Sequence, residues 1–509
     1  MSDRGVRLLE PETLRGRRPS ELLAALRQLR TEVSAEGEQT LERWRRGIAR
    51  HACKLGAANL AHYLALRRRD LRDLQDELTL LGLSSLGRLE ARVLANLDAV
   101  IAALAPHGGE HEAFPSARVF YRGERLLERN SRELFGRREP RRRAIMVTLG
   151  TEAAEDPDLL LDLARRGMDV ARINGAHDTP DLWARMVANL RHAGQQCRRD
   201  VRILFDLAGP SCRTGEVGLA DHRRLKPGDR LMLVRDSLID DERFPNQARC
   251  TLPEVLSRLA PGHTVWLDDG KLQGEVEQLL DQGALVRVLR TGPKGAKLKP
   301  EKGLYFPDTE LGLDPLMQAD LDALDFAVRE VDMIGYSFVQ RPEDVARLQD
   351  EMAARRADWR RLGLIAKVET RSAVQNLPEI IVQAARWQPF GVMIARGDLA
   401  LGIGFARLAE MQEELLWLCE AAHVPVVWAT EVLENLRKKG TFVRGEMTDA
   451  AMAARAECVM LNKGPYVGEA IDVLRGLLVR MGEHQNKKTP RLRALHAWDE
   501  AISRGAAAG

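Results

Sequence analysis

The chain has no long apolar run, no paired cysteines and no excess of charge of one sign. No stretch of about 18 consecutive apolar residues occurs, so we expect no membrane span. The six cysteines lie far apart and form no Cys-x-x-Cys pair, which argues against a disulfide framework or a zinc site. The 77 basic and 74 acidic residues leave a formal net charge of only +3. This balance gives no case for nucleic-acid or membrane binding.

The N-terminal residues do not resemble a secretory signal, because they include arginines but no apolar segment. Together with the scattered cysteines, this predicts an intracellular, cytoplasmic protein. The sequence does not fix the oligomeric state, and a homo-oligomer is compatible with it.

Residues 1–138 are expected to form a helical N-terminal extension. Leucines at spacings of three, four and seven recur between Leu60 and Leu78, and a second apolar stripe runs from Leu89 to Val100. Glycine is scarce there and β-branched residues do not cluster. The pattern predicts three or four helices, packed on each other or on the rest of the chain.

From Arg141 onward, short β-rich apolar runs alternate with helical stretches, which is typical of βα units around a parallel sheet. Eight such runs can be placed. They cover residues 145–150, 169–174, 201–208, 332–338, 364–369, 391–396, 425–430 and 458–462. Eight parallel strands alternating with helices predict an α/β fold, a closed (β/α)₈ TIM barrel.

More than 120 residues separate the third run from the fourth, which is longer than an ordinary loop. A connection of that length needs structure of its own, and it contains apolar alternation and Gly-rich turns. We therefore expect a small inserted β-domain at residues 216–305, placed over the barrel as a lid. The barrel would then comprise residues 139–215 and 306–485, followed by a flexible tail at 486–509.

Polar side chains follow five of the predicted strands, at the end where TIM barrels carry catalytic groups. They are Arg172, Asn174, Asp206, Lys367, Glu369, Asp398 and Thr430. Taken alone, each of them is better explained by an ordinary structural role. Lys367 and Glu369 could form a buried ion pair, and Thr430 could be an ordinary β-branched strand residue. Their coincidence at the ends of five strands favours a site instead.

Lys367 and Glu369 are two residues apart, so both side chains point to the same face of a strand. A charged pair inside a barrel is costly unless something compensates it. A cation held by Glu369 and Asp398 would do so, because Mg²⁺ is usually bound by one or two carboxylates plus substrate oxygens and water. Lys367 and Arg172 would then face a phosphoryl group.

These residues resemble the barrel motifs of the pyruvate kinase family, in chain order and with the insertion included. The matching segments are Arg172-Ile173-Asn174, Asp206 with Gly209-Pro210 and Arg213-Thr214-Gly215, Ile365–Glu369, Ile394–Leu399, Ala429–Glu434, Arg444–Asp449 and Val459–Leu461. LDDGKL at 267–272 and EKGLYFPD at 301–308 resemble parts of the family's inserted domain.

The resemblance implies a glycolytic phosphotransferase that moves a phosphoryl group from phosphoenolpyruvate to ADP, giving pyruvate and ATP. It implies that Lys367 stabilises the transferring group, and that Glu369 and Asp398 bind Mg²⁺ or Mn²⁺. Substrate would contact Arg172, Gly397, Asp398 and Thr430, with Thr430 near the protonated enolate carbon. His177, Arg213 and Lys302 would face the nucleotide, and Asn174 and Asp206 match ligands of the family's monovalent cation.

Several residues depart from the family pattern. The family has a serine at the position of Ala176 and often a threonine at the position of Leu207. The Ala208–Ser211 segment lacks a lysine and a glutamate of the family pattern. These changes leave K⁺ binding like the family's unsupported. Asn462-Lys463 loses a carboxylate and gains a cation near the barrel mouth. The family's C-terminal domain has no counterpart, so its sugar-phosphate control is not expected.

Three hypotheses remain open from the sequence. The chain could be a divergent pyruvate kinase-like phosphotransferase. It could instead be a metal-dependent lyase acting on a keto acid with the same carboxylates and no nucleotide. Finally, it could be a catalytically weak regulatory protein that keeps the fold. The altered loops at Ala208 and Asn462 slightly favour the second and third hypotheses, whereas the retained lysine, carboxylates and threonine favour the first.

Overall fold

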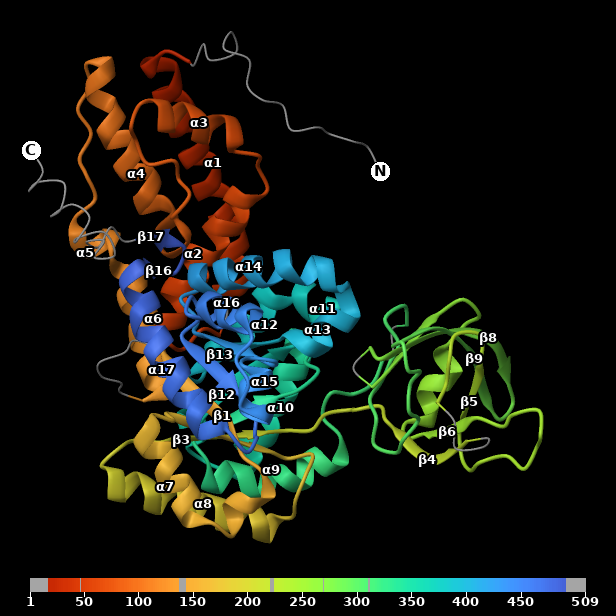
Figure 1. Cartoon of the computed structure of the whole chain (residues 1–509). Coiled ribbons are helices and arrows are strands. Elements are labelled where there is room, and N and C mark those ends of the chain that lie inside the picture. Colours follow the sequence, from red (N-terminus) through yellow and green to blue (C-terminus); the bar gives the residue numbers. More distant parts are fainter. Residues whose placement is uncertain are drawn as a thin grey trace, which may run out of the picture. The chain divides into compact units, whose positions relative to one another are not determined.

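A computed structural model of the chain describes residues 17–45, 47–136, 143–219, 224–268, 270–309 and 312–490 (Figure 1). These residues fall into two compact units. One comprises the N-terminal helices to Asn130 together with residues 385–387 and 417–424. The other contains the barrel and a separate β-sheet. The predicted boundary at 138/139 lies outside the described residues.

The barrel is closed by eight parallel strands, and each predicted run overlaps one of them. The order around the barrel is β1-β15-β14-β13-β12-β11-β3-β2. The strands are β1 (Ala144–Thr148), β2 (Val170–Asn174), β3 (Arg202–Asp206), β11 (Met333–Tyr336), β12 (Gly363–Val368), β13 (Phe390–Ala395), β14 (Val426–Ala429) and β15 (Cys458–Leu461). Helices cover their outer side, so nearly every strand residue is buried. The predicted TIM barrel is confirmed.

At least one helix follows each strand before the next strand begins. They are α7 (Pro157–Arg166), α8 (Pro180–Cys197), α9 (Gln318–Glu330), α10 (Pro342–Arg355), α11 (Arg371–Gln375), α12 (Leu377–Ala385), α13 (Arg396–Ile403), α14 (Phe405–Ala421), α15 (Glu434–Lys439), α16 (Arg444–Ala453) and α17 (Val467–His484). Short 3-10 turns lie at η4 (Thr151–Ala154) and η7 (Trp359–Arg361).

Apolar side chains fill the bottom of the barrel. Met146, Val170, Leu204 and Ile365 belong to this cluster, and Leu134 of helix α6 (Arg122–Phe135) joins them. A Cβ on Gly363 in β12 would lie 2.7 Å from a Leu134 methyl carbon, so this glycine makes room for the plug. No local sequence pattern predicted that a residue of the helical extension would close the bottom of the barrel.

The inserted segment forms a seven-stranded sheet in the order β10-β7-β8-β9-β5-β6-β4. Its strands, green in Figure 1, are β4 (Thr214–Gly218), β5 (Arg230–Val234), β6 (Gln247–Cys250), β7 (Thr264–Leu267), β8 (Leu272–Leu280), β9 (Gly283–Thr291) and β10 (Leu304–Tyr305), with the 3-10 turn η6 (Pro253–Arg258). It has an apolar core of its own. The inserted β-domain is thus confirmed as a fold.

The N-terminal segment is helical, as predicted, but its described residues contain six α-helices rather than three or four. They are α1 (Pro19–Arg45), α2 (His51–Arg67), α3 (Arg72–Leu80), α4 (Val93–Leu104), α5 (Ala117–Phe120) and α6 (Arg122–Phe135), with the turns η2 (Glu90–Arg92) and η3 (Ala105–Gly108). The prediction missed the short ones because a helix of four to nine residues shows little apolar periodicity.

The end of the described chain is a small antiparallel pair, β16 (Gln485–Asn486) with β17 (Thr489–Pro490). Lys487 between them is buried and its Nζ lies 2.5 Å from Glu457 Oε1. The predicted flexible tail begins in this pair, and its remaining residues, 491–509, lie outside the described part. No described helix has the length and apolar character needed to cross a membrane.

Candidate active site

Four polar side chains form the layer above the apolar bottom of the barrel. Each lies two residues beyond a bottom-layer residue of its own strand, so side-chain alternation turns it into the barrel. They are Thr148, Arg172, Asp206 and Lys367, which follow Met146, Val170, Leu204 and Ile365. This layer lies at the carboxyl ends of the strands, where TIM-barrel sites are built.

Arg172 and Asp206 form a buried ion pair between neighbouring strands. Nε of Arg172 donates to Oδ2 of Asp206 over 2.9 Å, and its Nη2 donates to the same oxygen. Nη1 donates to Thr148 Oγ1 over 3.1 Å. Burial alone would raise the pKa of Asp206, but Arg172 and Lys367 outweigh it and hold that pKa below its ordinary value.

Lys367 lies between two carboxylates. Its Nζ is 3.3 Å from Asp206 Oδ2 and 3.0 Å from Glu369 Oε1, and it donates to Ser337 Oγ over 2.7 Å. Burial alone would lower the pKa of Lys367, but Asp206 and Glu369 keep it above its ordinary value. The ammonium is therefore charged, fixed in place and almost excluded from water.

Glu369 is almost fully buried, and its Oε2 accepts a hydrogen bond from the Phe338 backbone N–H over 2.6 Å. Burial raises the pKa of Glu369 to about 7, against the charge of Lys367, and the nearby charge of Asp398 adds to the rise. Two neighbouring carboxylates that repel each other are suited to share a hard cation.

A metal cluster built from protein side chains alone is not present in the described part of the chain, where no three His, Cys, Asp or Glu side chains gather as ligands. Glu369 and Asp398 supply two carboxylates. This is the smaller donor set that Mg²⁺ uses when substrate and water complete its shell. Each Glu369 oxygen has one partner in the protein and retains a lone pair for a metal.

Thr430 adopts a backbone conformation that β-branched residues rarely take. Its φ is 65°, and the next residue, Glu431, also has a positive φ of 56°. Thr430 Oγ1 accepts a hydrogen bond from the Gly397 backbone N–H over 3.0 Å. Strain of this kind is stored where the surrounding structure fixes the residue, and functional sites are frequent among such places.

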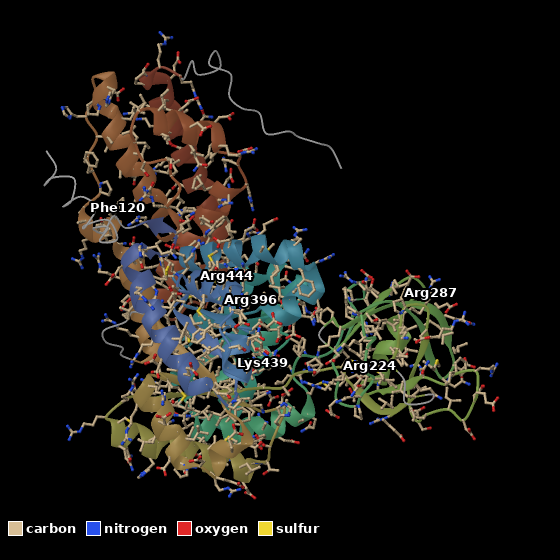
Figure 2. The ribbon with its side chains drawn as sticks, in the orientation of Figure 1. Phe120, Arg224, Arg287, Arg396, Lys439 and Arg444 are labelled. Carbon is tan, nitrogen blue, oxygen red and sulfur yellow. The ribbon has the colours of Figure 1, made fainter. Side chains whose placement is uncertain are left out.

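Arg396 holds the Thr430 segment in that conformation. Its Nε donates to Ala429 O over 3.0 Å and its Nη2 to Thr430 O over 2.6 Å. Asp449 binds the same guanidinium at 2.5 and 2.9 Å, and the guanidinium lies 4.6 Å from the Trp428 ring centroid. Figure 2 marks Arg396 within the barrel. Arg396 is thus a positioning residue for Thr430.

Two cations, Arg213 after β3 and Lys463 after β15, lie near His177, which follows β2. Burial lowers the pKa of His177, and Lys463 and Arg213 lower it further, so both cations lie near its ring. Arg213 Nη1 donates to Glu301 O over 3.2 Å. Asn174, another predicted residue, uses its side-chain oxygen to accept the Ala176 N–H over 3.3 Å.

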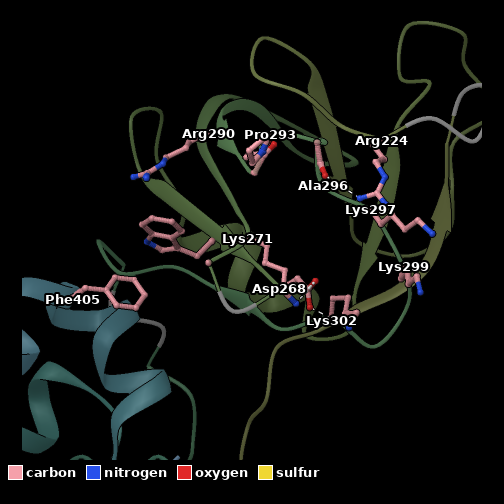
Figure 3. Close-up of a pocket in the computed structure, with 15 residues that line it drawn as sticks. Arg224, Asp268, Lys271, Arg290, Pro293, Ala296, Lys297, Lys299, Lys302 and Phe405 are labelled. Carbon is pink, nitrogen blue, oxygen red and sulfur yellow. Dashed lines mark hydrogen bonds and ion pairs between the residues drawn. The ribbon is translucent and has the colours of Figure 1, made fainter. Parts of the chain in front are cut away.

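Lys302 is placed differently from the other predicted residues. Its Nζ lies 3.1 Å from Asp268 Oδ1 within the β-domain (Figure 3). Among the residues that the structure describes, no ion pair joins the Lys302 ammonium to the buried layer of Lys367, and its partner is this carboxylate. Of the predicted site residues, Arg172, Asp206, Lys367 and Glu369 therefore form one connected cluster in the barrel. Gly397 and Thr430 are bonded to each other, and Lys302 belongs to the β-domain.

Comparison with known proteins decides the family. The profile "Pyruvate kinase, barrel domain" matches residues 140–471. The chain belongs to the pyruvate kinase family. It is 30% identical over 366 residues to the pyruvate kinase of Thermococcus litoralis, which covers 70% of this chain and 73% of that one. It is 31% identical over 346 residues to that of Methylorubrum extorquens, covering 67% and 68%.

The chain also spans 57% of the length of the Geobacillus stearothermophilus pyruvate kinase, at 30% identity over 349 residues, or 67% of this chain. Part of that relative therefore has no counterpart in the match. The match to the pyruvate kinase barrel covers the Arg172–Asp206–Lys367–Glu369 cluster, which lies entirely within residues 140–471.

Sequence reasoning missed three residues of this pyruvate kinase-family barrel that the structure connects to the site. Ser337 binds Lys367, Thr148 binds Arg172, and Arg396 positions Thr430. Each lies in the carboxyl-terminal half of a predicted strand, and this position is the signal that could have found them. Asn462 joins the same network, because its Oδ1 accepts from Thr148 Oγ1 over 3.3 Å.

Proposed function

We propose that this protein transfers the phosphoryl group of phosphoenolpyruvate to ADP and releases pyruvate and ATP, a glycolytic reaction carried out in the cytoplasm. The observation that carries the proposal is the charged, buried Lys367, fixed between Asp206, Glu369 and Ser337 at the mouth of the barrel. Family membership supports it, since the pyruvate kinases matched above share this barrel.

In the proposed reaction, Lys367 and Arg172 act by charge. A phosphoryl group in transfer spreads negative charge over its equatorial oxygens, and fixed cations stabilise that charge without reorganising. Asp206 holds both cations toward the barrel axis by its single shared oxygen. Breaking this pairing would leave both cations free to turn away from the substrate.

Mg²⁺, or Mn²⁺ in its place, would be held by Glu369 and Asp398 together with substrate oxygens. When bound, such a cation neutralises charge on the phosphoryl oxygens and on the enolate oxygen. Its binding would keep Glu369 ionised, although burial raises the pKa of that carboxyl in the protein alone. Asn174 and Asp206 provide a weaker case for K⁺, because Ala176 and Leu207 depart from the family pattern beside them. Asp206 Oδ2 binds two protein cations, whereas its Oδ1 is buried without a hydrogen-bond partner among the described residues.

We assign the remaining predicted residues by their position. Gly397 and Thr430 would contact the substrate, and the Thr430 hydroxyl would help deliver the proton to the enolate carbon. His177 and Arg213 would face the nucleotide, and Lys302 would join them when the β-domain closes as a lid over the barrel. The lid role is part of the proposal.

The test is pyruvate formation from phosphoenolpyruvate, ADP and Mg²⁺, with and without K⁺. We expect turnover by the natural chain and a loss of at least about 10³-fold in Lys367→Met, because a preorganised charge at the transferring group is removed. Lys54→Met, an exposed lysine of α2, is the matched control and should retain full activity.

Circular dichroism and thermal unfolding check whether Lys367→Met remains folded. A second variant, Lys367→Arg, tests whether positive charge alone restores part of the rate. Absence of pyruvate under every metal and nucleotide would refute the proposal. Cleavage or decarboxylation of a keto acid without nucleotide would indicate the lyase. Folding without ligand binding would indicate the regulatory protein.

A further inference from the structure

Two cysteines of the inserted β-domain are in contact, although they lie 38 positions apart in the sequence. The Sγ atoms of Cys212 and Cys250 are 3.3 Å apart, and both residues are present as thiols. Both side chains are buried in the apolar core of the β-domain. No Cys-x-x-Cys spacing or other local pattern predicts this contact, because it depends on the pairing of two strands.

Strand pairing brings the two thiols to one face of the sheet. Strands β4 and β6 are antiparallel neighbours, and Thr214 of β4 lies opposite Cys250 of β6. Cys212 comes two residues before Thr214, so side-chain alternation turns Cys212 and Thr214 to the same face. Cys212 and Cys250 are therefore diagonal neighbours on that face, and their sulfur atoms meet between the two strands.

Backbone hydrogen bonds hold the chain on both sides of the thiol pair. The Arg213 N–H donates to Thr251 Oγ1 over 2.8 Å, and the Thr251 N–H donates to Arg213 O over 2.9 Å. The Leu304 N–H, from the segment that returns to the barrel, donates to Cys212 O over 2.8 Å. Because the residues that follow the two cysteines are bonded to each other, the sulfur atoms stay within reach of each other.

The two thiols differ in acidity. Cys250 donates its single S–H to Leu252 O over 3.3 Å, so Cys212 is the donor in the bond between the sulfur atoms. This bond lowers the pKa of Cys250 below its ordinary value, whereas the same bond and burial raise the pKa of Cys212. The thiolate is the reactive form of cysteine. Cys250 is therefore the nucleophile of the pair, and Cys212 is the second thiol.

We propose that Cys212 and Cys250 form a redox modification site, at which a peroxide converts the two thiols reversibly into a disulfide. The sulfur atoms need to approach from 3.3 Å to about 2.05 Å. Both side chains are buried, which favours a small oxidant over exchange with a bulky disulfide. In a reducing compartment, disulfides of this kind are transient and redox-sensing.

With hydrogen peroxide, the reaction has two steps. The Cys250 thiolate attacks one peroxide oxygen, the O–O bond breaks, and a sulfenic acid and one water molecule form. The Cys212 sulfur then attacks the sulfenic sulfur and expels its oxygen as a second water molecule. The two thiols lose two electrons and two protons in total, and the peroxide takes up both. A dithiol reduces the disulfide and restores both thiols.

The disulfide would fix a residue of the proposed active site. Arg213 directly follows Cys212, and Thr251 directly follows Cys250, so the new bond lies beside the hydrogen bonds between Arg213 and Thr251. A cross-link restricts the opened chain, which makes separation of these two backbones rarer. Arg213 would then be less able to adjust to a nucleotide. This effect on Arg213 rests on the proposed function, whereas formation of the disulfide does not.

Mass spectrometry of the full chain after treatment with hydrogen peroxide tests the site. The protein is denatured with N-ethylmaleimide, which blocks the remaining thiols, and its digest is searched for peptides joined through Cys212 and Cys250. We expect this pair to be the main disulfide and dithiothreitol to remove it. Cys53→Ala, in the helical unit, is the control and should form the same disulfide. Cys250→Ala should form none, and Cys212→Ala replaces it if it fails to fold.

Hydrogen exchange and kinetics measure the consequence. On oxidation, exchange of the Thr251 amide should slow at least about tenfold in the natural chain and in Cys53→Ala, but not in Cys250→Ala. The KM for ADP should rise in parallel and return to its first value with dithiothreitol.

Three results would overturn the proposal: no reaction of the pair, overoxidation of either cysteine without a disulfide, or equal amounts of disulfides with other cysteines. An unchanged KM with the disulfide formed would refute the effect on Arg213. If the chain forms no pyruvate at all, the mass spectra and the amide exchange still decide whether the redox site exists.

Discussion

At the scale of single residues, the site depends on a backbone conformation and on buried charges that are unfavourable by themselves. The surrounding fold must stabilise them. Thr430 is held at φ 65° by Arg396, which binds the carbonyls on both sides of the bend. Lys367 is held charged in a buried position, whereas burial raises the pKa of its neighbour Glu369 to about 7. Such costs, about 1–3 kcal/mol for a strained residue, are met by surrounding contacts.

Replacing Thr430 separates strain from chemistry. Thr430→Val keeps the β-branched strain and loses the oxygen that accepts from Gly397 N–H, whereas Thr430→Gly relieves the strain. We expect the glycine variant to be more stable than the valine variant by about 1–2 kcal/mol, the reverse of the usual strand order. Both should lose pyruvate formation. Urea unfolding checks the order, and a more stable valine variant would contradict the strain.

His423, in the helical unit, predicts a pH dependence of stability. Burial lowers its pKa to about 4, and its Nε2 lies 3.0 Å from Ala91 O, where the neutral ring donates. Its unfolded pKa is near 6.5, so the unfolded state binds the extra proton between pH 6.5 and 4. Stability from this residue is complete above pH 6.5 and is lost as the pH falls toward 4, by up to about 3 kcal/mol.

His423→Asn tests that pH dependence, since asparagine tolerates the positive φ of 56° at this position. The variant should be less stable at pH 7.5 and should show a flatter decline between pH 6.5 and 4. Hydrogen exchange of α2 amides at a series of pH values measures this. An equally steep decline in the variant would assign the acid sensitivity to other groups.

At the scale of elements, strand positions were predictable and helix contacts were not. Each barrel strand carries a local signal of β-branched residues between turns, and each of the eight predicted runs overlaps a strand. Two features depend on contacts between segments that are distant in the sequence. Leu134 packs into the bottom of the barrel, and residues 417–424 group with the N-terminal helices. A single sequence contains no local signal for such contacts.

Gly56 of α2 shows such a contact. A Cβ there would lie 2.3 Å from the Ala422 carbonyl oxygen, within the helical unit. Gly→Ala in a helix interior ordinarily stabilises by about 1 kcal/mol. We expect Gly56→Ala instead to lower the unfolding temperature by several degrees. Gly476→Ala in α17 is the control and should not lower it, because among the described residues outside the helix backbone a Cβ there would meet just the end of the Arg480 side chain, at 3.7 Å. An equal change of unfolding temperature in the two variants would contradict the close approach of Gly56 to the Ala422 carbonyl.

At the scale of the whole molecule, family membership and site composition were accessible from the sequence because the motifs lie at strand ends. Lys367, Glu369, Asp206 and Arg172 were all named from spacing or resemblance, and the structure connects them. Ser337 and Arg396 were missed, because their importance lies in partners on other strands. The contact of Cys212 with Cys250 was missed for the same reason: the two cysteines lie 38 positions apart in the sequence.

The central claim is direct transfer of a phosphoryl group in the barrel. Phosphorus NMR of a mixture of the protein, phosphoenolpyruvate, ADP and Mg²⁺ tests it most directly. We predict that the phosphoenolpyruvate signal falls while the β-phosphate signal of ATP rises in equal amount, and that Lys367→Met shows neither change. Loss of phosphoenolpyruvate with only inorganic phosphate appearing, or no change with the natural chain, would contradict the account.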